Sequence, residues 1–217
     1  MKSNLRPCIM KVPFGALVIT AGVCGILSFA FLATSLGTDH WYIIEMNPMN
    51  ATDFEDVSSH SGLWRINEGG KIQAESIDSF SGDSSKYTET ELRILSMHGA
   101  IVVMLPFSLV LLLFGGICGL VSSLARSPVL LTSTAFYFFV CSLLTLCGAS
   151  LYIIYSYQAL AETESLVGPE GLAYIHTSFG WSLGLVWLSY GLELLTGTLL
   201  LIAAQMTKLQ QRGPTKA

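Results

Sequence analysis

Residues 99–124 read GAIVVMLPFSLVLLLFGGICGLVSSL and contain no charged side chain. An α-helix rises about 1.5 Å per residue, so this run is long enough to cross a hydrocarbon core about 30 Å thick. Lipid offers the backbone no hydrogen-bond partners, and a spanning segment satisfies its own polar groups by forming a helix. The run therefore predicts a transmembrane helix, with Pro106 in its first turns as the one helix breaker.

Three further apolar runs surround it, at residues 14–36, 129–155 and 179–204. Hydrophobic residues make up 52% of the 217-residue chain and charged residues 12%, whereas soluble domains carry about 25% charged residues. The first run has 23 residues, more than the roughly 7–15 of the apolar h-region of a signal peptide, so we expect a retained helix rather than a cleaved signal. The composition thus predicts a mainly α membrane protein: a single domain over residues 1–217, built as a four-helix transmembrane bundle.

Charge is distributed unevenly among the segments that connect these helices. The loop at 38–98 has eleven acidic and four basic residues, and the loop at 156–178 has three acidic residues and no basic one. The other segments outside the helices hold seven basic residues and no acidic one: Lys2, Arg6, Lys11, Arg126, Lys208, Arg212 and Lys216. Because Lys and Arg concentrate on the cytoplasmic side, both termini, including the tail at 205–217, are predicted to be cytoplasmic and both loops extracellular. We expect a multi-pass protein of the plasma membrane, with an apical or junctional location as one option.

The first loop is too long to be a simple connection. Its segments at 41–44 (WYII) and 62–66 (GLWRI) are rich in aromatic and β-branched residues and are predicted to be strands. Turns are expected at 67–70 and, in the second loop, at 168–171, with a mobile stretch at 78–89. Asn50-Ala51-Thr52 is an acceptor motif for N-glycosylation on the predicted outer side, so Asn50 is expected to carry a glycan.

These loop residues carry a family resemblance. Trp41 at the start of the first loop, Gly62-Leu63-Trp64 further along, and Arg93 just ahead of the second helix resemble the claudin superfamily, which includes peripheral myelin protein and calcium-channel gamma subunits. Segments 41–44, 58–65, 178–182 and 193–197 are most similar to the claudin-like transmembrane proteins 114 and 235. The resemblance implies a small extracellular antiparallel sheet lying on a left-handed four-helix bundle. Trp41, Leu63 and Trp64 are expected to form the small core of that outer domain and to have a structural role.

The cysteines depart from the family pattern. The family motif continues from Gly-Leu-Trp to a cysteine where this chain has Asn67, and no cysteine follows in the loop. All five cysteines lie in predicted helices or cytoplasmic segments: Cys8, Cys24, Cys118, Cys141 and Cys147. We therefore expect an outer domain without a disulfide. Cys8 and Cys118 are candidates for palmitoylation near the inner leaflet, or are simply small hydrophobic residues.

Two features lie within the predicted helices. Glu193 is the one ionisable residue there, and a charge in lipid costs several kcal/mol unless it is protonated or partnered. It is either an ion or partner site, or a hydrogen-bonded brace between helices. Small residues recur four apart, at Ala21 and Gly25, Gly115 and Gly119, and Gly180 and Gly184. Such pairs allow close helix packing, either within this bundle or between proteins.

No enzymatic motif emerges. The four histidines lie on the predicted outer side without partners at metal-ligand spacing, and neither a phosphate loop nor a nucleophile elbow occurs. We expect a protein without catalytic activity, cofactor or metal, with a zinc-dependent or hydrolytic outer domain as the remaining enzymatic alternative.

The favoured function is that of an auxiliary or adaptor subunit that binds and modulates other integral membrane proteins. These are a channel, a receptor or a second copy, together with membrane lipids but not nucleic acid. The alternative is a claudin-like adhesion or barrier protein of cell junctions, whose acidic outer surface would favour cations. The C-terminus, ending at Ala217, lacks the Tyr-Val ending through which many claudins bind junction scaffolds.

Overall fold

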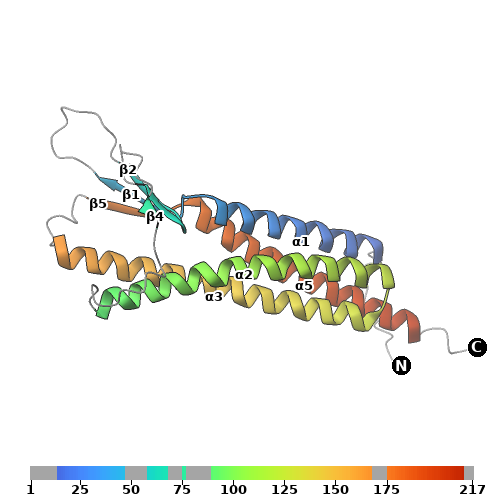
Figure 1. Ribbon diagram of the computed structural model, residues 1–217. Helices are drawn as coiled ribbons and strands as arrows, with labels where there is room; N and C mark the ends of the chain where they lie inside the picture. Colours follow the sequence, from blue (N-terminus) through green and yellow to red (C-terminus); the bar gives the residue numbers. More distant parts are fainter. Residues whose placement is uncertain (1–13, 47–57, 68–74, 77–88, 168–174, 213–217) are drawn as a thin grey trace, which may run out of the picture.

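The computed structural model describes residues 14–46, 58–67, 75–76, 89–167 and 175–212. In this part of the chain four long helices form a bundle, and a small sheet lies at one end of it (Figure 1). The helices are α1 (Phe14–Gly37), α2 (Glu89–Ala125), α3 (Pro128–Val167) and α5 (Trp181–Arg212). The strands are β1 (Tyr42–Met46), β2 (Ser58–Ser61), β3 (Arg65–Asn67), β4 (Glu75–Ser76) and β5 (Ile175–Phe179).

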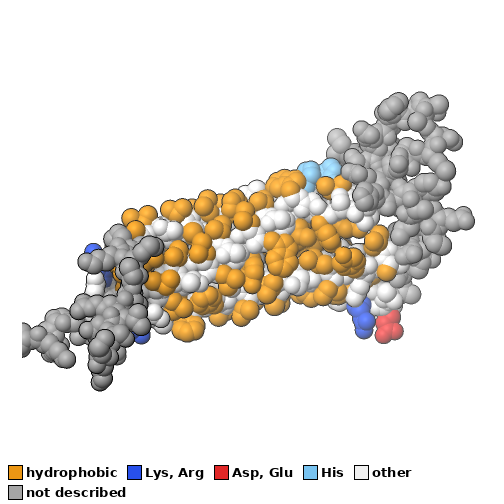
Figure 2. All heavy atoms as spheres, turned by 180° about the vertical axis from the view of Figure 1, so that it is seen from behind, with side chains coloured by type: hydrophobic (Ala, Val, Ile, Leu, Met, Phe, Trp, Pro, Cys, Tyr) orange, Lys and Arg blue, Asp and Glu red, His pale blue; other side chains and the backbone are white. Residues whose placement is uncertain are grey.

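All four helices are long and apolar enough to cross a membrane. Large hydrophobic side chains are exposed along their length, as for Ile19 at 68% and Val103 at 57%. Figure 2 shows these side chains covering the visible face of the bundle, with the charged residues of that face at its two ends. A surface of this kind is suited to lipid rather than to water. The predicted four-helix membrane bundle with a small antiparallel sheet is confirmed.

The helices are longer than the apolar runs that revealed them. Helix α2 begins at Glu89 rather than at Gly99, and α3 continues to Val167 instead of ending at Tyr155. Arg93, predicted to lie ahead of the second helix, is therefore an exposed residue within it. A helix satisfies its own backbone, so it continues into water where the apolar pattern has already ended. The membrane boundaries themselves stay predictions.

The four helices pack around a common core. Helix α5 lies between α1 and α3 and packs extensively on both, whereas α1 and α2 make the looser contact. Leu32, Leu105, Leu131 and Val186 contribute fully buried side chains to the core from the four helices. The short connection between α2 and α3 places Arg126 in the left-handed region (φ 47°), which ends α2 before Pro128 starts α3.

The five strands form one antiparallel sheet in the order β4-β3-β2-β1-β5. Strand β1 confirms the strand predicted at 41–44, and it pairs with β2 and β5 on either side. The strand predicted at 62–66 is present only in its second part, as β3 from Arg65, because Gly62–Trp64 form the tight connection between β2 and β3. The helix predicted from Phe179 starts instead at Trp181, since Phe179 ends β5.

Several predictions fall outside the described residues. These are the glycosylation motif at Asn50, the cysteine at Cys8, the turn at 168–171, and most of the turn at 67–70 and of the mobile stretch at 78–89. They remain predictions from the sequence.

Candidate functional site

The sheet is joined to the bundle through Trp41, whose side chain is completely buried. Its indole N–H donates to the carbonyl oxygen of Ser35 in the last turn of α1 (2.9 Å), and its ring packs on Tyr152 of α3 at 4.7 Å between centroids. Its backbone N–H donates to the carbonyl oxygen of Ser61 in β2, and its own carbonyl accepts from the N–H of Gly180 just before α5, both at 3.0 Å. Trp41 therefore connects three of the helices to the sheet.

The Gly62-Leu63-Trp64 turn also contributes to this junction between sheet and bundle, through contacts with α2 and with the α1–β1 connection. Leu63 is completely buried, and its carbonyl oxygen lies 3.1 Å from Nε2 of His98 on α2. Gly62 lies so close to Asp39 that an added Cβ would sit 2.7 Å from the Asp39 Cα. Only glycine fits at such a distance from another backbone, so this glycine allows the turn to lie directly on the α1–β1 connection.

Trp64 differs from the prediction that it belongs to the buried core. Its side chain is 43% exposed, and its indole N–H donates to the carbonyl oxygen of Leu36 at 2.8 Å. The interior position is already filled by Trp41, so the second ring covers the end of α1 from outside. The last four carbonyls of a helix lack partners within it. The indole N–H groups of Trp41 and Trp64 bond to two of these carbonyls, those of Ser35 and Leu36. Each tryptophan therefore helps to cap the C-terminal end of α1.

A second cluster lies inside the bundle around Glu193, whose side chain is completely buried. Thr145 of α3 donates to its carboxyl oxygens at 3.1 and 3.2 Å, and Ser189, one helical turn before it, donates at 3.3 Å. Ser108 of α2 lies 2.8 Å from the Thr145 hydroxyl, and Ser28 of α1 lies 2.9 Å from the Ser189 hydroxyl. The cluster thus contains at least one polar side chain from each of the four helices.

The hydroxyls of this cluster can be oriented as two consistent chains. Ser108 donates to Thr145, which donates to Glu193, and from the other side Ser28 donates to Ser189, which also donates to Glu193. No buried side-chain oxygen or nitrogen in the described residues lacks a partner. The sequence did not identify these four hydroxyl residues, because nothing in a single helix shows which face meets Glu193. The spacing of Ser189 and Glu193, four apart on one helix face, was the available signal.

An aromatic patch lies at the sheet end of the bundle, and it consists of Tyr42, Tyr157 and Phe179. The Tyr42 and Phe179 rings lie 5.8 Å apart and the Tyr157 and Phe179 rings 6.2 Å apart, both edge to face. Tyr157 is 61% exposed and Phe179 41% exposed. The patch borders a small hollow of about 90 Å³ between β5 and the outer part of α3. The sequence alone gave no sign of this patch, because its residues come from both loops and from α3.

A comparison with protein families fits this architecture. A family model described as PMP-22/EMP/MP20/Claudin tight junction matches residues 26–202, from α1 through the sheet to α5. The chain belongs to this claudin family. It is accordingly a multi-pass membrane protein. The narrower similarity to the claudin-like transmembrane proteins 114 and 235 stays a prediction.

In this claudin-family chain, the sheet has Asn67 at the position where the family motif has a cysteine. Asn67 ends β3 and pairs in register with His60 of β2. The four cysteines in the described residues are free: Cys24 and Cys141 are buried, and Cys118 and Cys147 are exposed. Cys118 lies on α2, seven residues before its end, where palmitoylation stays a prediction. The sheet is held through its backbone pairing and the tryptophan junction.

Two histidines of the claudin-family chain contact each other although they lie far apart in the sequence. The His40 and His60 rings are stacked at 4.8 Å between centroids, and Trp181 lies 5.7 Å from His40. Within the described residues, no group of three His, Cys, Asp or Glu side chains is placed to hold a metal ion. The stacked pair is part of the sheet–bundle junction.

Proposed function

We propose that this chain is a non-enzymatic plasma-membrane protein that binds other integral membrane proteins and modulates or organises them, as an auxiliary or adaptor subunit. The observation that carries the proposal is the exposed aromatic patch of Tyr42, Tyr157 and Phe179 on a sheet fixed to the bundle. Exposed aromatic side chains are enriched in protein interfaces, where they bury a large area at little cost in conformational entropy.

The rigid junction below the patch supports a binding role. Phe179 is followed directly by Gly180, whose N–H is bonded to Trp41, and Ser182 donates to the carbonyl of His40 at 3.2 Å. A surface that is ordered before binding loses less conformational freedom when a partner docks. The patch lies on the outer part of α3 and on the strand that leads into α5, where a neighbouring protein in the same membrane can reach it.

The proposed orientation places the sheet and this patch outside the cell. Arg126, in the α2–α3 connection, lies at the end of the bundle away from the sheet, and the sequence of the two terminal segments and this connection holds seven basic residues and no acidic one. Such a bias is typical of cytoplasmic segments. The carboxyl group of Glu193 is engaged by hydroxyls in the interior, which supports a role in bracing the bundle rather than in chemistry.

The test compares the wild type with Tyr157→Ala/Phe179→Ala in proximity labelling in a native tissue or cell type. We expect the variant to reach the cell surface normally and to lose a defined set of labelled channels or receptors. Leu143→Ala is the matched control, because Leu143 is 59% exposed on the lipid-facing surface of α3 but lies outside the patch. An unchanged set of labelled proteins in the double variant contradicts the proposal.

A junctional adhesion or barrier role is the second candidate, favoured by the acidic loops. They hold fourteen acidic and four basic residues, a balance that attracts cations. Freeze-fracture imaging of contacts between transfected cells separates the two functions. Continuous strands at the contacts would support the junctional role, and their absence together with patch-dependent labelling would support the auxiliary role.

A further inference from the structure

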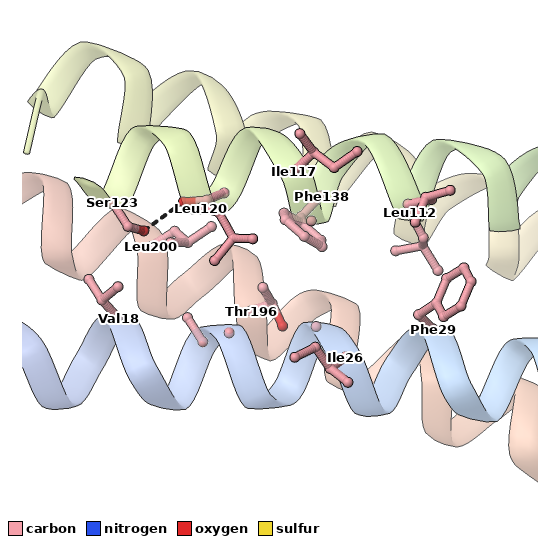
Figure 3. A pocket seen from close by; sticks show the side chains of 16 residues that line it. Val18, Ile26, Phe29, Leu112, Ile117, Leu120, Ser123, Phe138, Thr196 and Leu200 are labelled. Atoms are coloured by element: carbon pink, nitrogen blue, oxygen red, sulfur yellow. Dashed lines mark hydrogen bonds between the residues drawn. The ribbon is translucent and has the colours of Figure 1, made fainter. Parts of the chain in front are cut away.

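A groove opens between α1 and α2 in the half of the bundle away from the sheet, and its volume is about 300 Å³. Its walls are apolar side chains that also face the surrounding lipid, among them Ile26, 71% exposed, and Ile117, 52% exposed (Figure 3). Gly22 and Gly116 leave the space open, because a Cβ added to either would meet nothing within 4 Å. At these two positions the absence of a side chain does not bring α1 and α2 into contact. It leaves the space between them empty.

The length of the groove matches one leaflet of a bilayer. On α1 it extends from Val18 to Phe29 and on α2 from Leu112 to Ser123, which corresponds to about 16 Å along each helix axis. Figure 3 shows Val18 and Ser123 at one end and Phe29 and Leu112 at the other. A hydrocarbon core is about 30 Å thick, so the groove covers roughly half of it.

One end of the groove is polar, and a positive charge lies just beyond this end. The Ser123 hydroxyl lies at this end, and the exposed Arg126 follows three residues later in the turn after α2. The Arg126 guanidinium lies 5.7 Å from the ring centroid of Phe14, one turn before Val18 on α1. Arg126 therefore connects the ends of both helices that form the groove, just beyond its polar end.

We propose that this groove binds an anionic phospholipid, with an acyl chain between α1 and α2 and the headgroup phosphate at Arg126. An acyl chain is long and narrow, so it can lie lengthwise in an apolar groove that opens to the surrounding lipid. The positive charge at one end distinguishes an anionic lipid from a sterol. In the orientation proposed above, this end faces the cytoplasmic leaflet, where anionic lipids are concentrated.

The experiment uses the full chain in nanodiscs of phosphatidylcholine with phosphatidylserine, and in parallel with cholesterol. Native mass spectrometry counts the lipids retained after transfer to detergent. We expect the wild type to retain phosphatidylserine, and Gly116→Leu to lose it because leucine fills the groove. Gly22→Leu on the opposite wall provides an independent test of the same effect. Gly191→Leu is the matched control, since Gly191 also has open space around it and lies outside the groove.

The headgroup contact is tested separately. Arg126→Asn, in which Asn tolerates the left-handed backbone, should lower the preference for phosphatidylserine over phosphatidylcholine roughly fivefold, as expected for one basic residue at an anionic surface. Arg126→Lys should retain the preference. Equal retention of phosphatidylserine by the wild type and both leucine variants would overturn the proposal. So would retention of cholesterol in place of phospholipid, or dimers that only the leucine variants abolish.

Discussion

The hydroxyl group of Thr145 on α3 donates a hydrogen bond to the carboxyl group of Glu193 on α5, over 3.1 Å, and both side chains are completely buried. Ser108 and Ser28 extend this contact to α2 and α1 through Thr145 and Ser189. The bundle therefore has a polar centre in which each helix depends on its neighbours. A carboxyl group in such a position is expected to determine how the helices pack against one another.

Glu193→Ala is expected to destabilise the bundle by about 1–3 kcal/mol, because it removes the bonds from Thr145 and Ser189 to the carboxyl group and leaves a gap in the core. Glu193→Gln keeps an acceptor oxygen and should change stability by less than about 1 kcal/mol. Thermal unfolding of the purified protein in detergent measures both. Glu89→Ala, at an exposed position at the start of α2, is the control. If Glu193→Gln retains full stability but abolishes partner co-purification, Glu193 is a partner or ion site instead.

The two tryptophans should differ in their effect. Trp41→Ala removes a fully buried ring and is expected to cost about 3–5 kcal/mol, so the variant should be retained inside the cell. Trp64→Ala removes a partly exposed ring and one hydrogen bond and should cost about 1–2 kcal/mol, leaving a substantial fraction at the surface. Surface biotinylation compares the two variants. Equal retention of both would show that Trp64 contributes to the core after all.

Gly180→Ala should disrupt the junction between the sheet and α5. A Cβ at this position would overlap the carbonyl group of His40, so the backbone bonds from Gly180 and Ser182 must shift, at a cost of about 1–3 kcal/mol or more. Gly184→Ala, four residues later, meets nothing within 4 Å and should instead raise stability by about 0.5–1 kcal/mol. The difference between the two melting temperatures checks this. Similar values for both would contradict the close approach at His40.

The orientation of the bundle is tested with epitope tags on the two termini. The bias of seven basic residues to no acidic one predicts that both tags are stained only after permeabilisation. Tags inserted after Asp83, in the first loop, should be stained on intact cells. Staining of a terminal tag on intact cells would reverse the proposed orientation and place the sheet in the cytoplasm.

Asn50 is expected to be glycosylated if the first loop reaches the lumen of the secretory pathway. Glycosidase treatment should increase the electrophoretic mobility of the wild type and leave Asn50→Gln unchanged. Thr52→Ala removes the same motif without changing Asn50 and should behave like Asn50→Gln. A wild-type protein that does not respond to the glycosidase would contradict the prediction.

The architecture outside the membrane was only partly predictable. The aromatic and β-branched run at 41–44 identified β1, because that pattern is typical of a strand. Gly62-Leu63-Trp64 was assigned to a strand although it forms a turn, since the closeness of Gly62 to Asp39 is a relationship between distant residues. Strand β5 could not be recognised from Ile175–Phe179 alone, because it is stabilised by pairing with β1.

The sequence by itself determined the class of the protein and its helices. Long uncharged runs can be accommodated in lipid only as helices, and the Gly-Leu-Trp motif indicated the claudin family. The tertiary structure alone decided which side chains meet. It placed Thr145 against Glu193, and it buried Trp41 while leaving Trp64 exposed. It also assembled the aromatic patch from both loops and α3, and opened a groove between α1 and α2 beside Gly22. The apolar pattern of a membrane helix specifies its length and its exposure to lipid, but its rotation and its neighbours are set by packing and hydrogen bonds between helices.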